Sequence, residues 1–94
     1  MATATWNGTV IAESDDTVVV EGNHYFPLDS ISDGVLEPTD RTSVCPWKGT
    51  ASYFTVTVGG ERAENAAWTY LAPKDAAAAI KGHVAFYSVV DVTV

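Results

Sequence analysis

The residues most able to do chemistry lie in a single stretch. Arg41 to Phe54 holds the only cysteine of the chain, three aromatic residues and two of the five basic residues. Within this stretch, Pro46 favours a turn whose flanks are Cys45 and Lys48, with their Cα atoms within about 7 Å. A thiol beside an ammonium ionises more readily, so Cys45 is a candidate nucleophile whose pKa Lys48 would lower. The alternative is a Cys45 that is simply a small buried apolar residue, as buried cysteines commonly are, and a Lys48 that is solvated.

Two further charged residues extend this candidate site. Glu21 follows an apolar run and precedes Gly22, which is the usual setting of a solvated turn carboxylate. If its side chain instead points inward, towards Arg41 or Lys48, it becomes a candidate general base that would shuttle a proton. Arg41 and Lys48 together would also suit one anionic or polar group of a small ligand.

Aromatic residues are numerous for a chain of 94 residues. In a small β fold most of them form the core. The functional alternative is a pocket with aromatic walls, because tyrosine and tryptophan each supply a flat face and one polar group. The residues expected to wall such a pocket are Tyr25, Trp47, Tyr53 and Trp68.

Charge and composition exclude several classes of binding partner and cofactor. The net charge is −7, which opposes binding to nucleic acid or to an anionic membrane surface. A single cysteine excludes an internal disulfide, and the two histidines, His24 and His83, have no ligand spacing to each other or to Cys45. No glycine-rich phosphate loop occurs. We therefore expect no metal and no cofactor. The absence of a leader-like or long apolar run indicates a soluble, acidic, cytoplasmic protein.

Short β-like runs separated by turn residues predict the fold class. We expect one domain over residues 1–94, all-β, with short antiparallel sheets curled onto one another and one short helix. A turn is predicted at residues 37–40, and the helix at Pro73 to Lys81, where a proline opens the segment and four alanines follow. The expected strands are Thr5 to Ala12 with a bend at Gly8, the hairpin of residues 17–26, Thr50 to Val58, Ala66 to Leu71, His83 to Tyr87 and Val89 to Val94.

Nearly the full length also resembles a known family, the domain of unknown function numbered 427. The similarity lies in Tyr25-Phe26-Pro27, in the C-P-W-K-G-T-A-S-Y run that starts at Cys45, in the A-A-W-T-Y run that starts at Ala66, and in the segment from Ile80 to Tyr87. The resemblance implies a β-tent, a compact arrangement of coiled β-sheets. A nucleotidyltransferase label is sometimes attached to the family, but this chain has no paired aspartates beside a glycine-serine turn. It also lacks the metal-binding cysteine pairs of some tent-like relatives.

Three functions remain open. The first is a module that binds a small polar or anionic ligand in the aromatic-walled pocket, with Arg41 and Lys48 holding the ligand's polar group. The second is an enzyme that uses Cys45 as nucleophile, Lys48 or Arg41 to lower its pKa, and Glu21 to move a proton. The third is a homo-oligomeric structural protein whose aromatic residues lie in a subunit interface. The binding function is favoured, because cysteine catalysis usually needs a histidine partner and neither histidine is placed for it.

Overall fold

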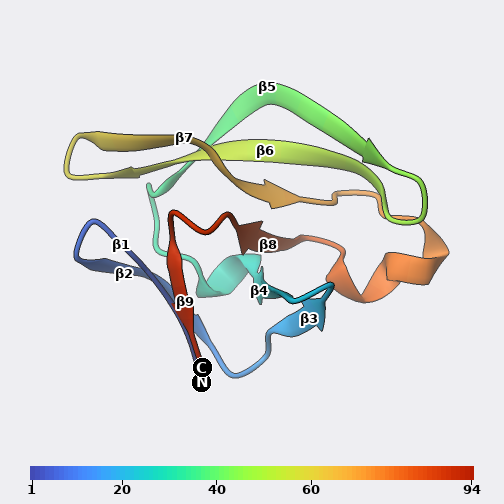
Figure 1. The fold of residues 1–94 in the computed structure, drawn as a ribbon, viewed down its shortest axis with the longest axis horizontal. Helices are drawn as coiled ribbons and strands as arrows, with labels where there is room; N and C mark the ends of the chain where they lie inside the picture. The colour runs from blue at the N-terminus through green and yellow to red at the C-terminus, as the bar shows by residue number, and fades with distance from the viewer.

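The protein is built almost entirely of antiparallel strands. The computed structural model describes all residues, 1–94, and contains no helix long enough and apolar enough to cross a bilayer (Figure 1). Two short 3-10 helices, η1 and η2, interrupt the strands. In chain order the elements are β1 (Ala2–Trp6), β2 (Thr9–Ser14), β3 (Val18–Val20), β4 (Asn23–Pro27), η1 (Leu28–Ser30), β5 (Leu36–Cys45), β6 (Gly49–Val58), β7 (Glu61–Thr69), η2 (Asp75–Ile80), β8 (His83–Phe86) and β9 (Asp91–Thr93).

The strands form two sheets, which confirms the predicted all-β class. One sheet has three strands in the order β2-β1-β9, and the other has six in the order β3-β4-β8-β7-β6-β5. β1 pairs with both β2 and β9, so the two ends of the chain lie side by side (Figure 1). The three-stranded meander of β5, β6 and β7 arches over the rest of the molecule in the same view. This arrangement matches the coiled-sheet fold that the family resemblance implied.

The interior is divided into two apolar clusters. The larger one joins the three-stranded sheet to the six-stranded sheet through residues such as Ile11, Phe26 and Phe86. The smaller one gathers Tyr25, Trp68 and other residues of the six-stranded sheet against Ile80 of η2. Three of the four aromatic residues predicted to wall a pocket, Tyr25, Tyr53 and Trp68, lie in this second cluster.

The first predicted strand is in fact a hairpin. Instead of one strand bent at Gly8, the chain forms β1 and β2, with Trp6 paired to Thr9. Asn7 and Gly8 have φ values of 51° and 74°, which are the left-handed values of a tight two-residue hairpin turn. Asn-Gly favours this turn strongly, because both residues tolerate positive φ.

The predicted turn at residues 37–40 lies inside a strand. β5 runs through it, and the register with β6 shifts between Pro38 and Thr42. Proline is tolerated there because β5 is the edge strand of its sheet and the irregularity leaves its missing N–H unneeded. β7 likewise begins at Glu61, five residues before the predicted start, and it too has a register shift, opposite Thr55.

The alanine-rich segment forms 3-10 helix over Asp75–Ile80, shorter than the predicted span and not a regular α-helix. Alanine favours helix, but no side chain caps the first turn, and Ala77 departs from helical geometry at φ −122°. Only Ala77 and Ile80 are buried, so packing supplies little energy to regularise so short a helix.

Candidate functional site

The Cys45–Gly49 stretch is a tight hairpin end. Cys45 of β5 pairs with Gly49 of β6, which leaves Pro46 to Lys48 as the connecting loop. The backbone of Gly49 has a φ of 113°, a value that a side chain disfavours. Lys74 holds the loop from outside: its backbone N–H donates to the carbonyl of Lys48 at 2.9 Å, and its Nζ donates to the carbonyl of Pro46 at 2.7 Å. The predicted turn therefore exists and is fixed in place.

Lys48 is buried rather than solvated. Only 7% of the residue is exposed, and its Nζ donates to Glu21 in an ion pair. The ammonium also lies 5.2 Å from the ring centre of Trp47 and 5.8 Å from that of Tyr70. Burial disfavours the charged amine, but the hydrogen bond to Glu21, together with the nearby Tyr25, Tyr70 and Cys45, outweighs it and raises the pKa of Lys48.

Glu21 reaches Lys48 from the β3–β4 turn. Its backbone has a left-handed φ of 53°, followed by Gly22 at 79°, which are the values of a two-residue turn between paired Val20 and Asn23. The inward orientation that would make Glu21 a general-base candidate is therefore the one present, and its partner is Lys48 and not Arg41. The side chain remains 54% exposed, so solvent reaches the pair from this side.

Cys45 lies near the Lys48–Glu21 ion pair but is not part of it. The thiol is free and half-buried, and it packs against the smaller apolar cluster. Lys48 is close enough for Cys45 to influence its pKa, but the direct partner of the ammonium is the carboxylate. Cys45, Lys48 and Glu21 are thus brought together, with the positive charge already compensated.

The four aromatic residues expected to wall a pocket do not surround a common cavity. Tyr25 is fully buried, and Trp68 is 9% exposed and donates from Nε1 to the Tyr25 hydroxyl at 3.1 Å. Their rings meet edge to face, which is a core contact. Trp47 is exposed on the hairpin loop. The structure contains two surface cavities, and neither is lined by any of the four.

Arg41 instead joins a stack of tyrosines. Its guanidinium lies 5.0 Å from the ring centre of Tyr53, and Tyr53 stacks on Tyr87 at 6.4 Å with an interplanar angle of 12°. The Tyr53 hydroxyl is hydrogen-bonded to Ser43 at 2.9 Å and to the Tyr87 hydroxyl at 3.4 Å. Burial would raise the pKa of Tyr53, but hydrogen bonds from Ser43 and Tyr87 and the charge of Arg41 outweigh burial, so the pKa is lowered. The hydrogen bond to Tyr53 raises the pKa of Tyr87.

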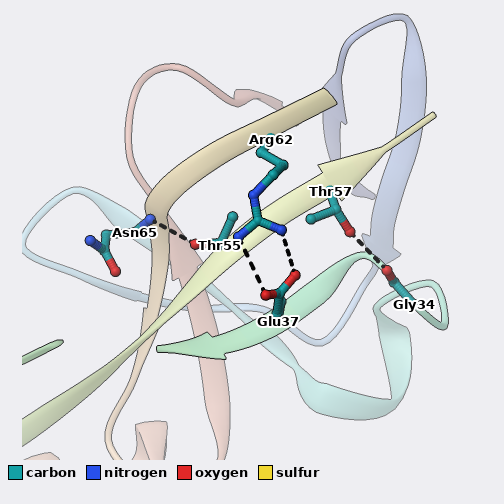
Figure 2. A network of polar contacts seen from close by, with 6 residues as sticks. All are labelled: Gly34, Glu37, Thr55, Thr57, Arg62 and Asn65. Atoms are coloured by element: carbon teal, nitrogen blue, oxygen red, sulfur yellow. Dashed lines mark hydrogen bonds and ion pairs between the residues drawn. The ribbon is translucent and has the colours of Figure 1, made fainter. Parts of the chain in front are cut away.

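The larger cavity lies next to this stack and has a volume of about 530 Å³. We call it the Arg41 cavity. The register shifts of β5 and β7 place its walls, since both strands bulge away from β6 at this point. On β7, Asn65 adopts a left-handed φ of 53° and its N–H bonds to Thr55 Oγ1 at 3.3 Å (Figure 2). The residues that line the Arg41 cavity are Arg41, Ala63, Glu64, Asn65, Ala66, Tyr87 and Val89.

A hydrogen bond ties the two bulges together. Thr39 Oγ1 donates to the side-chain oxygen of Asn65 at 2.7 Å and accepts the backbone N–H of Arg41 at 3.3 Å. The position of Arg41 thus depends on Asn65 across the sheet. Sequence reasoning identified Arg41 but missed Asn65 and Tyr87, because an asparagine inside a polar run and a tyrosine at a strand end gave no pattern of their own. The one available signal for Asn65 was that asparagine tolerates positive φ better than most residues.

The other arginine of the large sheet, Arg62, is paired. Arg62 on β7 holds Glu37 on β5 through two hydrogen bonds, of 2.7 and 3.3 Å, across the face of β6 (Figure 2). The hydrogen bond to Arg62 and its positive charge lower the pKa of Glu37. Arg41 takes part in none of the ion pairs of the structure. No group of three or more histidine, cysteine, aspartate or glutamate side chains is arranged to hold a metal ion.

Fold and site together define a small all-β domain with coiled antiparallel sheets, a hairpin loop that carries a buried lysine, and an arginine beside a surface cavity. Over residues 1–94 the chain matches the family model described as a domain of unknown function, DUF427, and it belongs to that family. A search of curated proteins finds no match.

Proposed function

We propose that the protein is a binding module for a small anionic molecule, held in the Arg41 cavity. The observation that supports this most directly is an arginine that has no carboxylate partner although the chain is strongly acidic. A guanidinium offers a planar set of donors suited to a carboxylate or a phosphate. The wall beside it is aromatic, so the ligand class is a small acid with a flat or apolar body.

Tyr53 and Tyr87 have separate roles in this proposal. The ring of Tyr53 packs against the guanidinium of Arg41. Tyr87, which is half-exposed, offers its ring and hydroxyl to the ligand. The volume of about 530 Å³ falls within the usual range of small-molecule sites, roughly 300–1,000 Å³. Relative to the sequence hypothesis, Arg41 is kept as the ligand-binding residue, and Tyr87 takes the part assigned to Tyr25, Trp47, Tyr53 and Trp68.

The test is a thermal-shift screen of small carboxylates and phosphates against the wild type, Arg41→Gln and Arg62→Gln. Both variants remove one positive charge from the same sheet, but only Arg41 lines the cavity. A true ligand at about 100 times its Kd stabilises the wild type by about 2.7 kcal/mol. We expect Arg62→Gln to keep this shift and Arg41→Gln to lose it. Equal shifts in all three proteins would remove the proposal.

The second candidate is an enzyme, and the observation in its favour is the convergence of Cys45, Lys48 and Glu21. In this case Glu21 accepts the proton of the Cys45 thiol, and the sulfur adds to an electrophilic carbonyl carbon of the substrate as the C=O π bond opens to an oxyanion that Lys48 stabilises. The Cys45→Ser variant separates the two candidates, because the Arg41 cavity does not include Cys45. Full retention of activity or binding in this variant rules out the nucleophile, and an iodoacetamide reaction no faster than that of an ordinary cysteine weakens it further.

A further inference from the structure

Four aromatic side chains form a continuous series of contacts from the core to the surface. The rings of Tyr25 and Trp68 meet edge to face with their centres 6.3 Å apart, and the ring of Trp68 lies 4.6 Å from that of Tyr87. Tyr87 in turn stacks on Tyr53. Three of the four are buried, whereas Tyr87 is 45% exposed. Tyr87 is therefore the one member of this set, which we call the aromatic series, that reaches solvent.

Tyr87 borders both surface cavities of the protein. It lines the Arg41 cavity and also the second cavity, of about 420 Å³, which lies where β4 and β8 are no longer paired. Its hydroxyl has one hydrogen-bond partner in the protein, the hydroxyl of Tyr53 at 3.4 Å. The ring and the hydroxyl of Tyr87 are thus both accessible to water and to reactive small molecules.

Tryptophan and tyrosine are among the side chains that lose a single electron most readily. An oxidised indole takes an electron from a tyrosine in contact with it, because the tyrosyl radical is the more stable of the two at neutral pH. The tyrosine has to release its phenol proton together with the electron, since a phenol that has lost an electron is a very strong acid. Which tyrosine is oxidised therefore depends on which one has an acceptor for this proton.

The two tyrosines in contact with Trp68 differ in where this proton can go. Tyr25 is fully buried, and the only hydrogen bond of its hydroxyl is the one that it accepts from Trp68 Nε1 at 3.1 Å. The proton of Tyr25 thus has no acceptor in the protein. Tyr87 is exposed, so its proton can pass directly to water. An electron lost from Trp68 is therefore replaced from Tyr87 and not from Tyr25.

We propose that Tyr87 is a site of oxidative modification, which receives the oxidation of Trp68 and couples with Tyr87 of a second copy of this protein to form dityrosine. A one-electron oxidant, such as a peroxyl radical that is reduced to a peroxide anion, takes an electron from Trp68. Tyr87 supplies an electron to the indole radical cation and releases its phenol proton to water, which restores Trp68 with its Nε1–H in place.

The product of this transfer is a tyrosyl radical at the protein surface. Two such radicals form a carbon–carbon bond between the ring positions ortho to their oxygens, and each ortho hydrogen then moves to the oxygen of its own ring. Tyr53 is enclosed by Ser43 and Tyr87, to which its hydroxyl is hydrogen-bonded, so its ring is not available for this coupling. The modification needs no ligand in the Arg41 cavity and is separate from the proposed function.

The test is a laser flash that excites tryptophan in the presence of pentaamminechlorocobalt(III), a complex that accepts one electron irreversibly. The protein is the Trp6→Phe/Trp47→Phe variant, in which Trp68 is the only tryptophan. We expect the absorption of the indole radical to decay and that of a tyrosyl radical to grow with the same first-order rate constant. This constant should not change with protein concentration, because the transfer occurs within one molecule.

Three variants in this background identify the tyrosine. Tyr87→Phe should lose the tyrosyl signal and leave the indole radical to persist. Tyr70→Phe removes the same hydroxyl from the apolar cluster that contains Trp68, but Tyr70 is outside the aromatic series, so the rate should stay unchanged. Tyr25→Phe should also keep the transfer. Transfer that survives in Tyr87→Phe, or that is lost equally in Tyr70→Phe, would overturn the proposal.

Peptide mapping of the wild-type protein after continuous illumination with the same complex identifies the product. The salt concentration is raised so that the net charge of −7 does not keep two copies apart. We expect a covalent dimer with dityrosine at Tyr87, which is absent from Tyr87→Phe and present in Tyr70→Phe. Cys45 is the competing site, because its thiol packs against the cluster that contains Trp68. Oxidation that ends at Cys45, or no dityrosine at Tyr87, contradicts the proposal.

Discussion

At the scale of single residues, Lys48 is the most constrained charged group of the protein. Its ammonium is enclosed by aromatic rings and compensated by one carboxylate from another hairpin. Because its pKa is raised, the folded chain binds this proton more tightly than the unfolded chain. The resulting contribution to stability is complete below the ordinary lysine pKa of about 10.4 and is lost as the pH rises through the raised value.

Glu21→Gln should lower the pKa of Lys48, since burial then acts on the ammonium without the opposing carboxylate. The variant should also destabilise the protein by about 1 kcal/mol, a modest cost because Glu21 is half-exposed and water screens the pair. Titration of the side-chain carbon signals of lysine measures the pKa, and urea unfolding measures the stability. Lys81 serves as the internal reference, and a Lys48 pKa that does not fall would show that Glu21 does not hold the charge.

The second residue-scale prediction concerns Tyr53 and Arg41. Tyr53 should have a lower pKa than Tyr70 and Tyr87, whose pKa values are raised by burial and by the hydrogen bond to Tyr53, respectively. Arg41→Gln should raise the pKa of Tyr53, because the variant removes the charge that favours the phenolate. Ring-carbon signals of labelled tyrosine, followed against pH, report each value.

The sign of the linked stability follows from the same shift. A lowered pKa in the folded state adds stability above the ordinary tyrosine pKa of about 10, and this gain is lost as the pH falls through the lower folded value. Arg62→Gln is the matched control, because Arg62 pairs with Glu37 and does not contact the stack. If the pKa of Tyr53 responds equally to both variants, the charge of Arg41 is not what lowers it.

At the scale of elements, irregularities in the strands make the site. The bulges of β5 and β7 open the Arg41 cavity, and the divergence of β4 from β8 opens the second one. A regular ladder at either place would have closed the space with paired backbone. Asn65 is the residue on which the first opening depends, because it supplies both the left-handed backbone and the acceptor for Thr39.

Asn65→Ala should therefore destabilise the protein by roughly 1–3 kcal/mol, through loss of the hydrogen bond and a backbone conformation that alanine disfavours. Asn65→Gly should cost less, since glycine tolerates the same φ and only the hydrogen bond is lost. Urea unfolding of both variants measures the difference. Equal costs would show that the left-handed backbone is not retained, and the bulge would then have no local cause in Asn65.

How far the sequence predicts these elements depends on whether the determining contact is local. The β6 strand and the Gly59-Gly60 turn followed from alternation and from glycine pairs, and both are present. The sequence offers the pairing of Glu21 with Lys48 only as one of two alternatives. The two residues are 27 apart in sequence and meet through the packing of two hairpins. The bulge at residues 39–41 was missed because Pro38 and Asp40 look like a turn, while the bonds that keep the chain extended come from β6 and β7.

At the scale of the whole molecule, membership of the DUF427 family accounts for the match along the full chain but assigns no activity. The fold supplies two cavities, and Tyr87 lines both of them. The oligomeric alternative belongs to this scale, since Val44, Trp47 and Leu71 are exposed apolar residues. It predicts a mass that rises with concentration.

If the binding function is correct and no interface is needed, light scattering should give a mass near 10.0 kDa at every concentration tested. A stable interface buries roughly 800 Å² per partner, and this is the surface that the oligomeric alternative has to supply. Trp47→Ser is the matched variant, because Trp47 is the largest exposed apolar residue at the hairpin end. A concentration-dependent mass that this variant abolishes would favour the structural role instead.

The central claim is that Arg41 binds an anionic ligand, and the most direct measurement is an amide chemical-shift titration of the labelled protein with phenylacetate. The account predicts saturable shifts at Arg41, along residues 63–66, and at Tyr87 and Val89, with loss of these shifts in Arg41→Gln and their retention in Arg62→Gln. Shifts that centre on Cys45 and Lys48 instead, or that persist in Arg41→Gln, would contradict it.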